Sequence, residues 1–309
     1  MSVIILGSLN MDLVARAPHL PAPGETIIGS AFSTAPGGKG ANQAVAVARL
    51  GVPTRMVGRV GADAYGEALR ESLRAAGVDT RLIETDMASS TGVAIISVDD
   101  TAENSIIVIP GANGQLDKTD VARLAAHLAG CDALLLQLEA PLDVNLAAAR
   151  AAQEAGVRVI LDPAPAQTLP DDLYRLVDIL TPNQVEAAHL TGIAIHDRED
   201  AVRAADALLA KGARAVIVKL GAAGALYRSA DAQGFVPAFE VEAVDTVAAG
   251  DAFNGGLAAA LSAGRALPEA VRHGCAVAAL AVTREGAQPS MPTASEVETF
   301  LQPAKMRVS

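Results

Sequence analysis

The chain has 309 residues, of which 51% are hydrophobic, and it carries a formal net charge of −11 at pH 7. This length suits one large α/β domain or two small ones, and the acidic balance without any Lys/Arg cluster argues against nucleic-acid binding. Because the chain has no run of about 18 uncharged apolar residues, we expect no membrane-spanning helix. The two cysteines, Cys131 and Cys275, have neither the number for a disulfide framework nor the spacing of metal ligands, which favours a location in the reducing cytoplasm.

The first segment, residues 1–6, predicts a buried strand and not a secretory signal, because it lacks the basic stretch that opens such a signal. The segment Gly7-Ser8-Leu9-Asn10-Met11-Asp12 follows at the carboxyl end of that strand, where open α/β sheets bind ligands. A single residue separates Asn10 from Asp12, so both side chains can converge on neighbouring hydroxyls of a polyol. A turn with an Asx cap is the alternative.

Two early regions predict a small sheet inserted into the main domain. Residues 12–35 are rich in Pro and Gly, and residues 90–110 predict two strands around a turn at 99–104. The strand at 91–96 is apolar on both faces, which is unusual for a flap open to water. One face would cover the substrate and the other a partner subunit.

Between these regions lies a glycine-rich turn, Pro36-Gly37-Gly38-Lys39-Gly40-Ala41-Asn42-Gln43, that leads into a predicted helix. It is not a Walker A loop, because Lys39 is followed by Gly40 and the glycine spacing differs. The chain also has no G-x-G-x-x-G motif, which weakens a dehydrogenase interpretation.

The rest of the chain alternates short apolar runs with Ala-rich amphipathic segments, the pattern of a doubly wound α/β sheet. Buried strands are predicted at 133–138, 157–161, 178–180 and 215–220, with helices at 143–155 and 198–211 between them. We therefore predict a single α/β domain over residues 1–309. Its mostly parallel sheet is flanked by helices, and a small inserted β-sheet lid is formed by residues 12–35 and 90–110.

The segment Val244-Asp245-Thr246-Val247-Ala248-Ala249-Gly250-Asp251-Ala252-Phe253-Asn254-Gly255-Gly256 combines a turn of small residues with the start of a predicted helix. Backbone N–H groups at Ala248, Ala249 and Gly250 can approach a ligand closely, and a helix N-terminus attracts a phosphate. Asp251 could then take a proton from a hydroxyl beside that phosphate, as phosphoryl transfer to an alcohol requires. A plain helix cap is the alternative.

The pattern D-T-x-A-A-G-D-x-F-N-G closely resembles the second signature of the ribokinase-like (PfkB) family of sugar kinases. In that family the aspartate is the catalytic base and the preceding turn is the anion hole, which implies Asp251 as base and Ala248, Ala249 and Gly250 as the hole. The segments G-S-L-N-x-D and G-G-K-G-A-N-Q-A are similar to the sugar-binding half of the ribokinase subgroup. The resemblance covers essentially the whole chain.

The resemblance implies a sugar site and a nucleotide site. The implied sugar contacts are Asn10, Asp12, Gly38, Lys39, Gly40, Asn42, Glu139 and Asp251. The implied nucleotide contacts are Asn183, Glu186, Lys219, Gly221, Gly224, Gly250 and Cys275.

Three of these assignments have alternatives. Glu139 follows an apolar run, and a solvated glutamate just past a strand is its other interpretation. Asn183 and Glu186 are three residues apart, so they can organise water around Mg²⁺ from one helix face or form an ordinary capping box. The glycines at 221 and 224 could equally serve a hairpin.

The segment at 281–290 resembles the ribokinase loop that, with the segment at Asp245 and Val247, holds a monovalent cation. The implied K⁺ ligands are Asp245, Val247, Ala281, Arg284, Gly286 and Ser290. All of them except Asp245 and Ser290 would bind mainly through their backbone carbonyls. The implied cofactors are ATP, Mg²⁺ and K⁺, and the resemblance also implies a homodimer formed through the lid.

The implied activity is ATP-dependent phosphorylation of D-ribose at O5, giving ribose 5-phosphate. Two positions depart from the family: Lys219 stands where Thr is common, and Cys275 where His or Asn is often found. Kinases for 2-deoxyribose, fructose or adenosine are alternatives, as is a non-catalytic sugar-binding regulator. Five Phe, three Tyr and no Trp disfavour a nucleoside acceptor, and the intact Asp251 disfavours the regulator.

Overall fold

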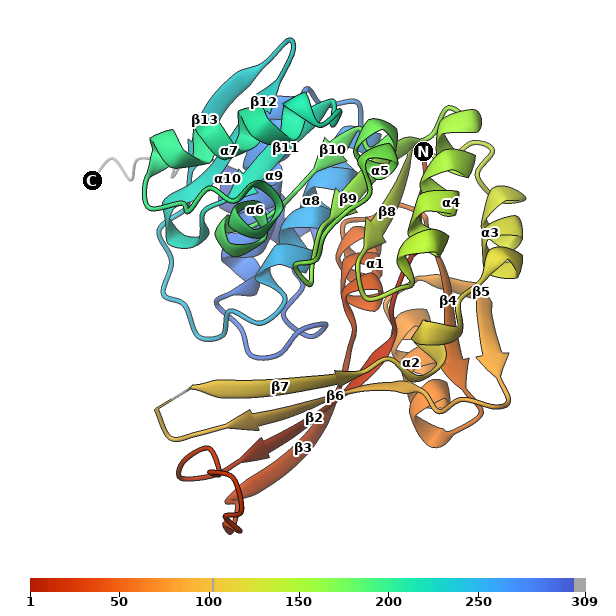
Figure 1. Cartoon of the computed structure of the whole chain (residues 1–309), viewed down its shortest axis with the longest axis vertical. Helices are drawn as coiled ribbons and strands as arrows, with labels where there is room; N and C mark the ends of the chain where they lie inside the picture. The colour runs from red at the N-terminus through yellow and green to blue at the C-terminus, as the bar shows by residue number, and fades with distance from the viewer. Residues whose placement is uncertain (102, 303–309) are drawn as a thin grey trace.

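The computed structural model describes residues 1–101 and 103–302. Ala102, which belongs to the predicted turn at 99–104, and residues 303–309 lie outside the described residues. The central sheet has nine strands in the order β13-β12-β11-β10-β9-β8-β1-β4-β5 (Figure 1). Their bounds are β1 Val3–Leu6, β4 Thr54–Gly61, β5 Asp79–Asp86, β8 Ala133–Gln137, β9 Arg158–Asp162, β10 Ile179–Leu180, β11 Ala215–Lys219, β12 Gly224–Ser229 and β13 Gln233–Pro237.

Helices cover both faces of this sheet (Figure 1). One core contains residues of α1 Lys39–Arg49, α2 Ala64–Ala75, α8 Ala249–Ser262, α9 Leu267–Ala281 and α10 Ala294–Leu301. The other contains residues of α3 Lys118–Ala125, α4 Leu142–Glu154, α5 Asp171–Leu176, α6 Gln184–Thr191 and α7 Arg198–Ala210. Successive residues of β1 enter opposite cores, because side chains alternate along a strand: Val3 and Ile5 in one, Ile4 and Leu6 in the other.

The strand directions confirm the predicted doubly wound fold. Every neighbouring pair from β5 to β11 is parallel, and only β12 and β13 run antiparallel at one edge. The predicted helices at 143–155 and 198–211 are α4 and α7, each within one residue of its expected ends. The strand expected at 178–180 starts only at Ile179. The backbone of Asp178 still bonds both neighbouring strands, with its N–H donating to Val159 O at 3.0 Å and its carbonyl accepting from Ala215 N at 2.9 Å. Its carboxylate also accepts hydrogen bonds from Val159 N and Arg214 Nη1, both at 2.8 Å.

A second sheet projects from the main body (Figure 1). Its four strands, in the order β3-β2-β6-β7, are β2 Asn10–Arg16, β3 Ala31–Gly37, β6 Gly92–Val98 and β7 Asn104–Ile109. The alternative of an Asx-capped turn at Asn10 and Asp12 is wrong, because both residues lie within β2. In β7 the apolar residues Ile106, Ile107, Val108 and Ile109 are all exposed.

The order of the main sheet creates a crevice between β1 and β8. From β1 the chain adds β4 and β5 on one side, and from β8 it adds the remaining strands on the other. Ligands of open α/β sheets bind at such reversals, beyond the carboxyl ends of the strands. Across the described residues, no helix combines the length and apolar character needed to cross a membrane.

Candidate active site

Glu139 occupies this crevice just after β8. Its Oε2 accepts hydrogen bonds from the Ser8 hydroxyl, from Asn10 Nδ2 at 3.3 Å and from the backbone N–H of Lys39 at 3.2 Å. The carboxylate therefore joins the segment after β1 to the glycine-rich turn. A freely solvated glutamate, the alternative interpretation, does not describe this position.

Asn10 and Asp12 lie two residues apart on β2 and so point to the same face of the small sheet. Asn10 Oδ1 accepts a hydrogen bond of 2.7 Å from Asn113 Nδ2. Asn113, in the short 3₁₀ segment Gly111–Gln115, also bonds both backbone groups of Leu9, at 2.9 and 3.0 Å. Sequence reasoning missed this buried side chain, which fixes the orientation of the Asn10 amide.

The buried and acidic surroundings of Asp12 raise the pKa of its carboxyl group. Burial, followed by the negative charges of Glu139 and Asp251, raises the pKa of Asp12 to about 7. Gly37 in β3 lies directly against this carboxylate, since a Cβ at Gly37 would come within 2.3 Å of Asp12 Oδ2. Asp12 is thus a carboxylate whose charge changes near neutral pH.

The glycine-rich turn packs tightly against the segment that follows β1. Gly38 has a φ of 87° and is the N-cap of α1, and a Cβ there would lie 2.6 Å from Asn10 N. A Cβ at Gly40 would lie 2.7 Å from Ser8 N. Only glycine permits this approach, which sets Lys39 and Asn42 at the start of α1 beside the crevice.

Asp251 lies in the first turn of α8 and is 3% exposed. Its carboxylate accepts hydrogen bonds from Asn42 Nδ2 at 3.0 Å and Gln43 Nε2 at 3.1 Å. Burial raises the pKa of Asp251, whereas the positive charge of Lys39 lowers it. Asp251 is therefore a buried carboxylate held by amide donors, with a cation nearby.

The turn before Asp251 exposes backbone N–H groups. Ala248 adopts a left-handed conformation, with a φ of 58°, which costs a non-glycine residue roughly 1–2 kcal/mol. Within the described chain, the N–H groups of Ala248, Gly250 and Asp251 donate to no backbone carbonyl, whereas that of Ala249 donates to Thr246 O at 3.2 Å. Strain and unpaired donors at a helix N-terminus together make an anion site.

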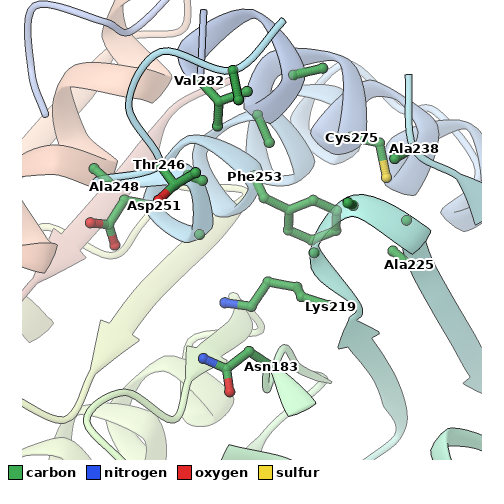
Figure 2. Close-up of a pocket in the computed structure, with 18 of the residues that line it drawn as sticks. Asn183, Lys219, Ala225, Ala238, Thr246, Ala248, Asp251, Phe253, Cys275 and Val282 are labelled. Carbon is green, nitrogen blue, oxygen red and sulfur yellow. The ribbon is translucent and has the colours of Figure 1, made fainter. Parts of the chain in front are cut away.

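A cavity of about 870 Å³ extends from this turn, a size suited to a small-molecule ligand. Ala248 and Asp251 lie at one end, and Cys275 and Ala238 at the other (Figure 2). Lys219 extends from β11 along one side of the cavity. The cavity is thus polar at one end and apolar at the other.

The predicted nucleotide residues line this cavity: Asn183, Glu186, Lys219, Gly221, Gly224, Gly250 and Cys275. Gly221, with a φ of 56°, begins the 3₁₀ turn after β11, and Gly224, with a φ of 118°, is the first residue of β12. The same glycines therefore close a hairpin and line the cavity. Burial raises the pKa of Cys275 to about 12, so its thiol is neutral at the apolar end.

Asn183 and Glu186 form a capping box at the start of α6. Asn183 Oδ1 accepts from Glu186 N at 2.9 Å, and Glu186 Oε2 accepts from Asn183 N at 2.7 Å. The capping alternative therefore describes their hydrogen bonds, and both residues also line the cavity. Burial raises the pKa of Glu186, and Lys219 opposes this shift.

The segments proposed for the monovalent cation meet beside α8. Asp245 Oδ1 accepts from Val247 N and Asp245 Oδ2 from Gly286 N, each at 2.9 Å. Ser290 Oγ donates to Ala287 O at 2.8 Å. Of the other predicted ligands, Ala281 O accepts from Arg284 N at 3.1 Å, and the Arg284 guanidinium pairs with Glu296. Among the described residues, no three His, Cys, Asp or Glu side chains gather as a metal cluster.

Comparison with known proteins decides the family. The model of the pfkB family of carbohydrate kinases matches residues 1–294. The chain belongs to this family. A ribokinase of Haemophilus influenzae is 43% identical to this pfkB-family chain over 303 residues, covering 98% of the chain and 99% of the relative.

Two further relatives bear on the substrate. A deoxyribokinase of Salmonella typhi is 36% identical over 302 residues, covering 97% of this chain and 99% of the relative. The structure of Arabidopsis thaliana ribokinase complexed with ribose and ATP matches with a TM-score of 0.91 at 33% identity, covering 98% of this chain and 99% of that one.

Proposed function

We propose that this protein transfers the γ-phosphoryl group of ATP to O5 of D-ribose. The observation that carries the proposal is the position of Asp251, which lines the cavity and also faces the acidic crevice around Asp12. A base, free backbone N–H donors and a polyol site thus meet at one point. The similarity to ribokinases, including one bound to ribose and ATP, supports the same assignment.

In the proposed reaction the ribose hydroxyls bind to Asn10, Asp12, Asn42 and Glu139, beside the glycine turn of Gly38, Lys39 and Gly40. Asp251 accepts the proton of the 5-hydroxyl while that oxygen attacks the γ-phosphorus, and the bond from this phosphorus to the β,γ-bridging oxygen breaks, so that ADP leaves. The N–H groups of Gly250 and Asp251 stabilise the charge that develops on the phosphoryl oxygens. The Lys39 ammonium would also stabilise this charge. It is available to do so because within the described chain no carboxylate forms an ion pair with it.

ATP would lie in the cavity, with its phosphates toward Ala248–Asp251 and its base at the apolar end near Cys275. Asn183 and Glu186 suit a Mg²⁺ ion that they hold through water, since Mg²⁺ keeps several water ligands and is also bound by the phosphates of the nucleotide. A bound Mg²⁺ would neutralise charge on those phosphates.

The donor set at Asp245 and the 281–290 loop fits K⁺ in kind: one carboxylate, the Ser290 hydroxyl and backbone carbonyls. Asp245 already ties the loop at Gly286 to the irregular segment that leads into the phosphate turn. K⁺ held by Asp245, Val247, Ala281, Arg284, Gly286 and Ser290 would stiffen this junction. A rise of kcat with K⁺ over Na⁺ would support the site.

The small sheet is proposed as a lid that covers ribose and excludes water, and as the interface of a homodimer. Exposed apolar residues on its strands, including Phe32, Ile95 and Ile107, support this proposal, because such patches mark interaction sites. Light scattering showing a monomer at micromolar concentration would contradict the dimer. Use of ATP and two unpaired thiols, Cys131 and Cys275, support a cytoplasmic location.

The proposed function is tested by ADP release with MgATP and a panel of ribose, 2-deoxyribose, fructose and adenosine, each in K⁺ or Na⁺. We expect ribose to give the highest kcat/KM. A preference for 2-deoxyribose would leave the assignment as a sugar kinase intact and change the assigned acceptor. The similarity to a deoxyribokinase is the reason to include this sugar. Calorimetry showing ribose binding without turnover would favour the sugar-binding regulator.

Ribose binding should release protons near neutral pH. The pKa of Asp12 is about 7 in the free protein, and hydroxyls that donate to this carboxylate stabilise its ionised form. Ribose affinity should therefore increase as pH rises through 7, and Glu139→Gln should move this dependence to lower pH by removing a negative charge. Calorimetry in buffers of different ionisation enthalpy measures the released protons. Affinity that does not change between pH 6 and pH 8 would contradict the assignment of Asp12.

A further inference from the structure

Three polar side chains stand at the carboxyl ends of apolar parallel strands of the main sheet: Gln137 of β8, Asp162 of β9 and Lys219 of β11. Asp162 is 2% exposed, and its Oδ1 lies 2.8 Å from the Lys219 ammonium. A carboxylate this deeply buried is retained only when it is paired and hydrogen-bonded. Asp162 has both kinds of partner, and it contacts groups from each half of the site.

Gln43 connects Asp162 to the catalytic base. Gln43 Nε2 donates to Asp162 Oδ2 and to Asp251 Oδ1, each at 3.1 Å. Its Oε1 accepts from Gln137 Nε2 at 2.6 Å. The chemistry fixes this orientation, because two carboxylates require a donor and the reversed amide would place an oxygen against both.

Asp162 also places Lys219 at the phosphate turn. A Cβ built on Gly250 would lie 3.3 Å from Lys219 Nζ, so the ammonium sits beside the first turn of α8, where free N–H groups face the cavity. The two lysines of this region differ. Lys219 is ion-paired, whereas no carboxylate of the described residues lies within 4.0 Å of the Lys39 ammonium.

We propose that Asp162 is a positioning residue for both reactants: it holds Lys219 at the site of the ATP phosphates and, through Gln43, sets the position of the Asp251 carboxylate. The part of this inference that concerns Asp251 rests on the proposed function. The part that concerns Lys219 depends only on nucleotide binding. Neither Asp162 nor Gln43 needs to touch a substrate for this role.

The first test is a double-mutant cycle on the affinity for a non-hydrolysable ATP analogue with Mg²⁺, in the absence of sugar. Asp162→Asn and Lys219→Met should each weaken binding by about 10- to 100-fold, because each removes the charge from one partner of a buried hydrogen-bonded pair. The double variant should bind no more weakly than Lys219→Met alone. Additive losses, or tighter binding by Asp162→Asn, would overturn the proposal, since Asp162 would then compete with ATP for Lys219.

The second test examines the effect on Asp251 separately, with the variant Gln43→Met. Gln43→Met keeps the Asp162–Lys219 pair, so it should lower kcat by about 10-fold through misplacement of Asp251 and leave ATP affinity unchanged. Thermal unfolding followed by circular dichroism checks separately that Asp162→Asn is folded. Loss of ATP affinity in Gln43→Met, or an unchanged kcat, would contradict the link through Gln43.

The pH profile of kcat gives a readout that a purely structural role would not change. Asp251 is faced by Lys39 from α1, Asp12 from β2 and Asp162 from β9. The negative charge of Asp162 raises the pKa of Asp251. Asp162→Asn should therefore lower this pKa, keep the base ionised in more acidic solution and shift the acid limb to lower pH. An unmoved limb would indicate loosened packing and overturn the proposal.

Asp172→Asn is the matched control, because it breaks an exposed ion pair of 3.1 Å with Arg175, and neither residue lines the cavity. It should leave ATP affinity, kcat and the pH profile unchanged. If the wild-type protein phosphorylates no sugar, the proposed function fails while the ATP-binding cycle still decides the role of Asp162 toward Lys219. If ribose is phosphorylated and the cycle shows no coupling, only the positioning role fails.

Discussion

Replacing Asp251 by Asn should lower kcat for ribose phosphorylation by about 10²–10⁴-fold, the usual contribution of a general base. The asparagine has the same shape and can still accept a hydrogen bond from Asn42 Nδ2, so we expect the fold to survive. Its amide NH₂ would face Gln43 Nε2, however, and two donors cannot satisfy each other. We therefore expect a loss of stability of about 1–3 kcal/mol as well.

Steady-state kinetics and thermal unfolding followed by circular dichroism measure the two effects separately. The control is Asp120→Asn, a fully buried carboxylate in α3 that pairs with Arg59 on the far side of the sheet from α8. It should lose stability and keep kcat. A fully active Asp251→Asn protein would show that another group takes the proton.

The fold could be predicted from local pattern because the parallel strands are buried on both faces. The runs that form β8, β9 and β11 consist almost entirely of Ala, Leu, Ile and Val, a composition typical of parallel strands that are covered on both faces. Strand β10 was harder to delimit, since a strand of two residues carries little pattern.

The segment at Asn10 shows how residue type can mislead. Asn and Asp are common in turns, and a turn was therefore a reasonable alternative. The alternation of Asn10, Met11, Asp12 and Leu13 is nevertheless the period of a strand with one polar face. The periodicity was the better guide, because the small sheet presents this polar face to the crevice.

The candidate site was predictable where its residues form compact motifs and not where they depend on distant partners. Gln43 and Asp162 are 119 residues apart, and Asn10 and Asn113 are 103 apart. No local pattern specifies such pairs. The available signal was positional: Gln137, Asp162 and Lys219 each place a polar side chain at the end of an apolar strand, on the edge where ligands bind.

Replacing Lys39 by Met should lower kcat by about 10²–10³-fold, the usual cost of removing one group that stabilises transition-state charge. Burial alone lowers the pKa of Lys39, but the negative charges of Asp251, Asp162, Glu139 and Glu186 outweigh burial and raise it. Lys39 is therefore a permanent cation at the point where the cavity meets the crevice. Its methionine replacement keeps the length of the side chain and removes the charge.

The pH profile distinguishes this loss of charge from damage to the turn. Lys39 lowers the pKa of Asp251, so Lys39→Met should raise that pKa, protonate the base over a wider range and shift the acid limb of kcat to higher pH. This direction is opposite to that expected for Asp162→Asn. Lys118→Met, at an exposed helix start, is the control and should change neither quantity. A lower kcat with an unmoved acid limb would mean that Lys39 shapes the glycine-rich turn and does not act through its charge.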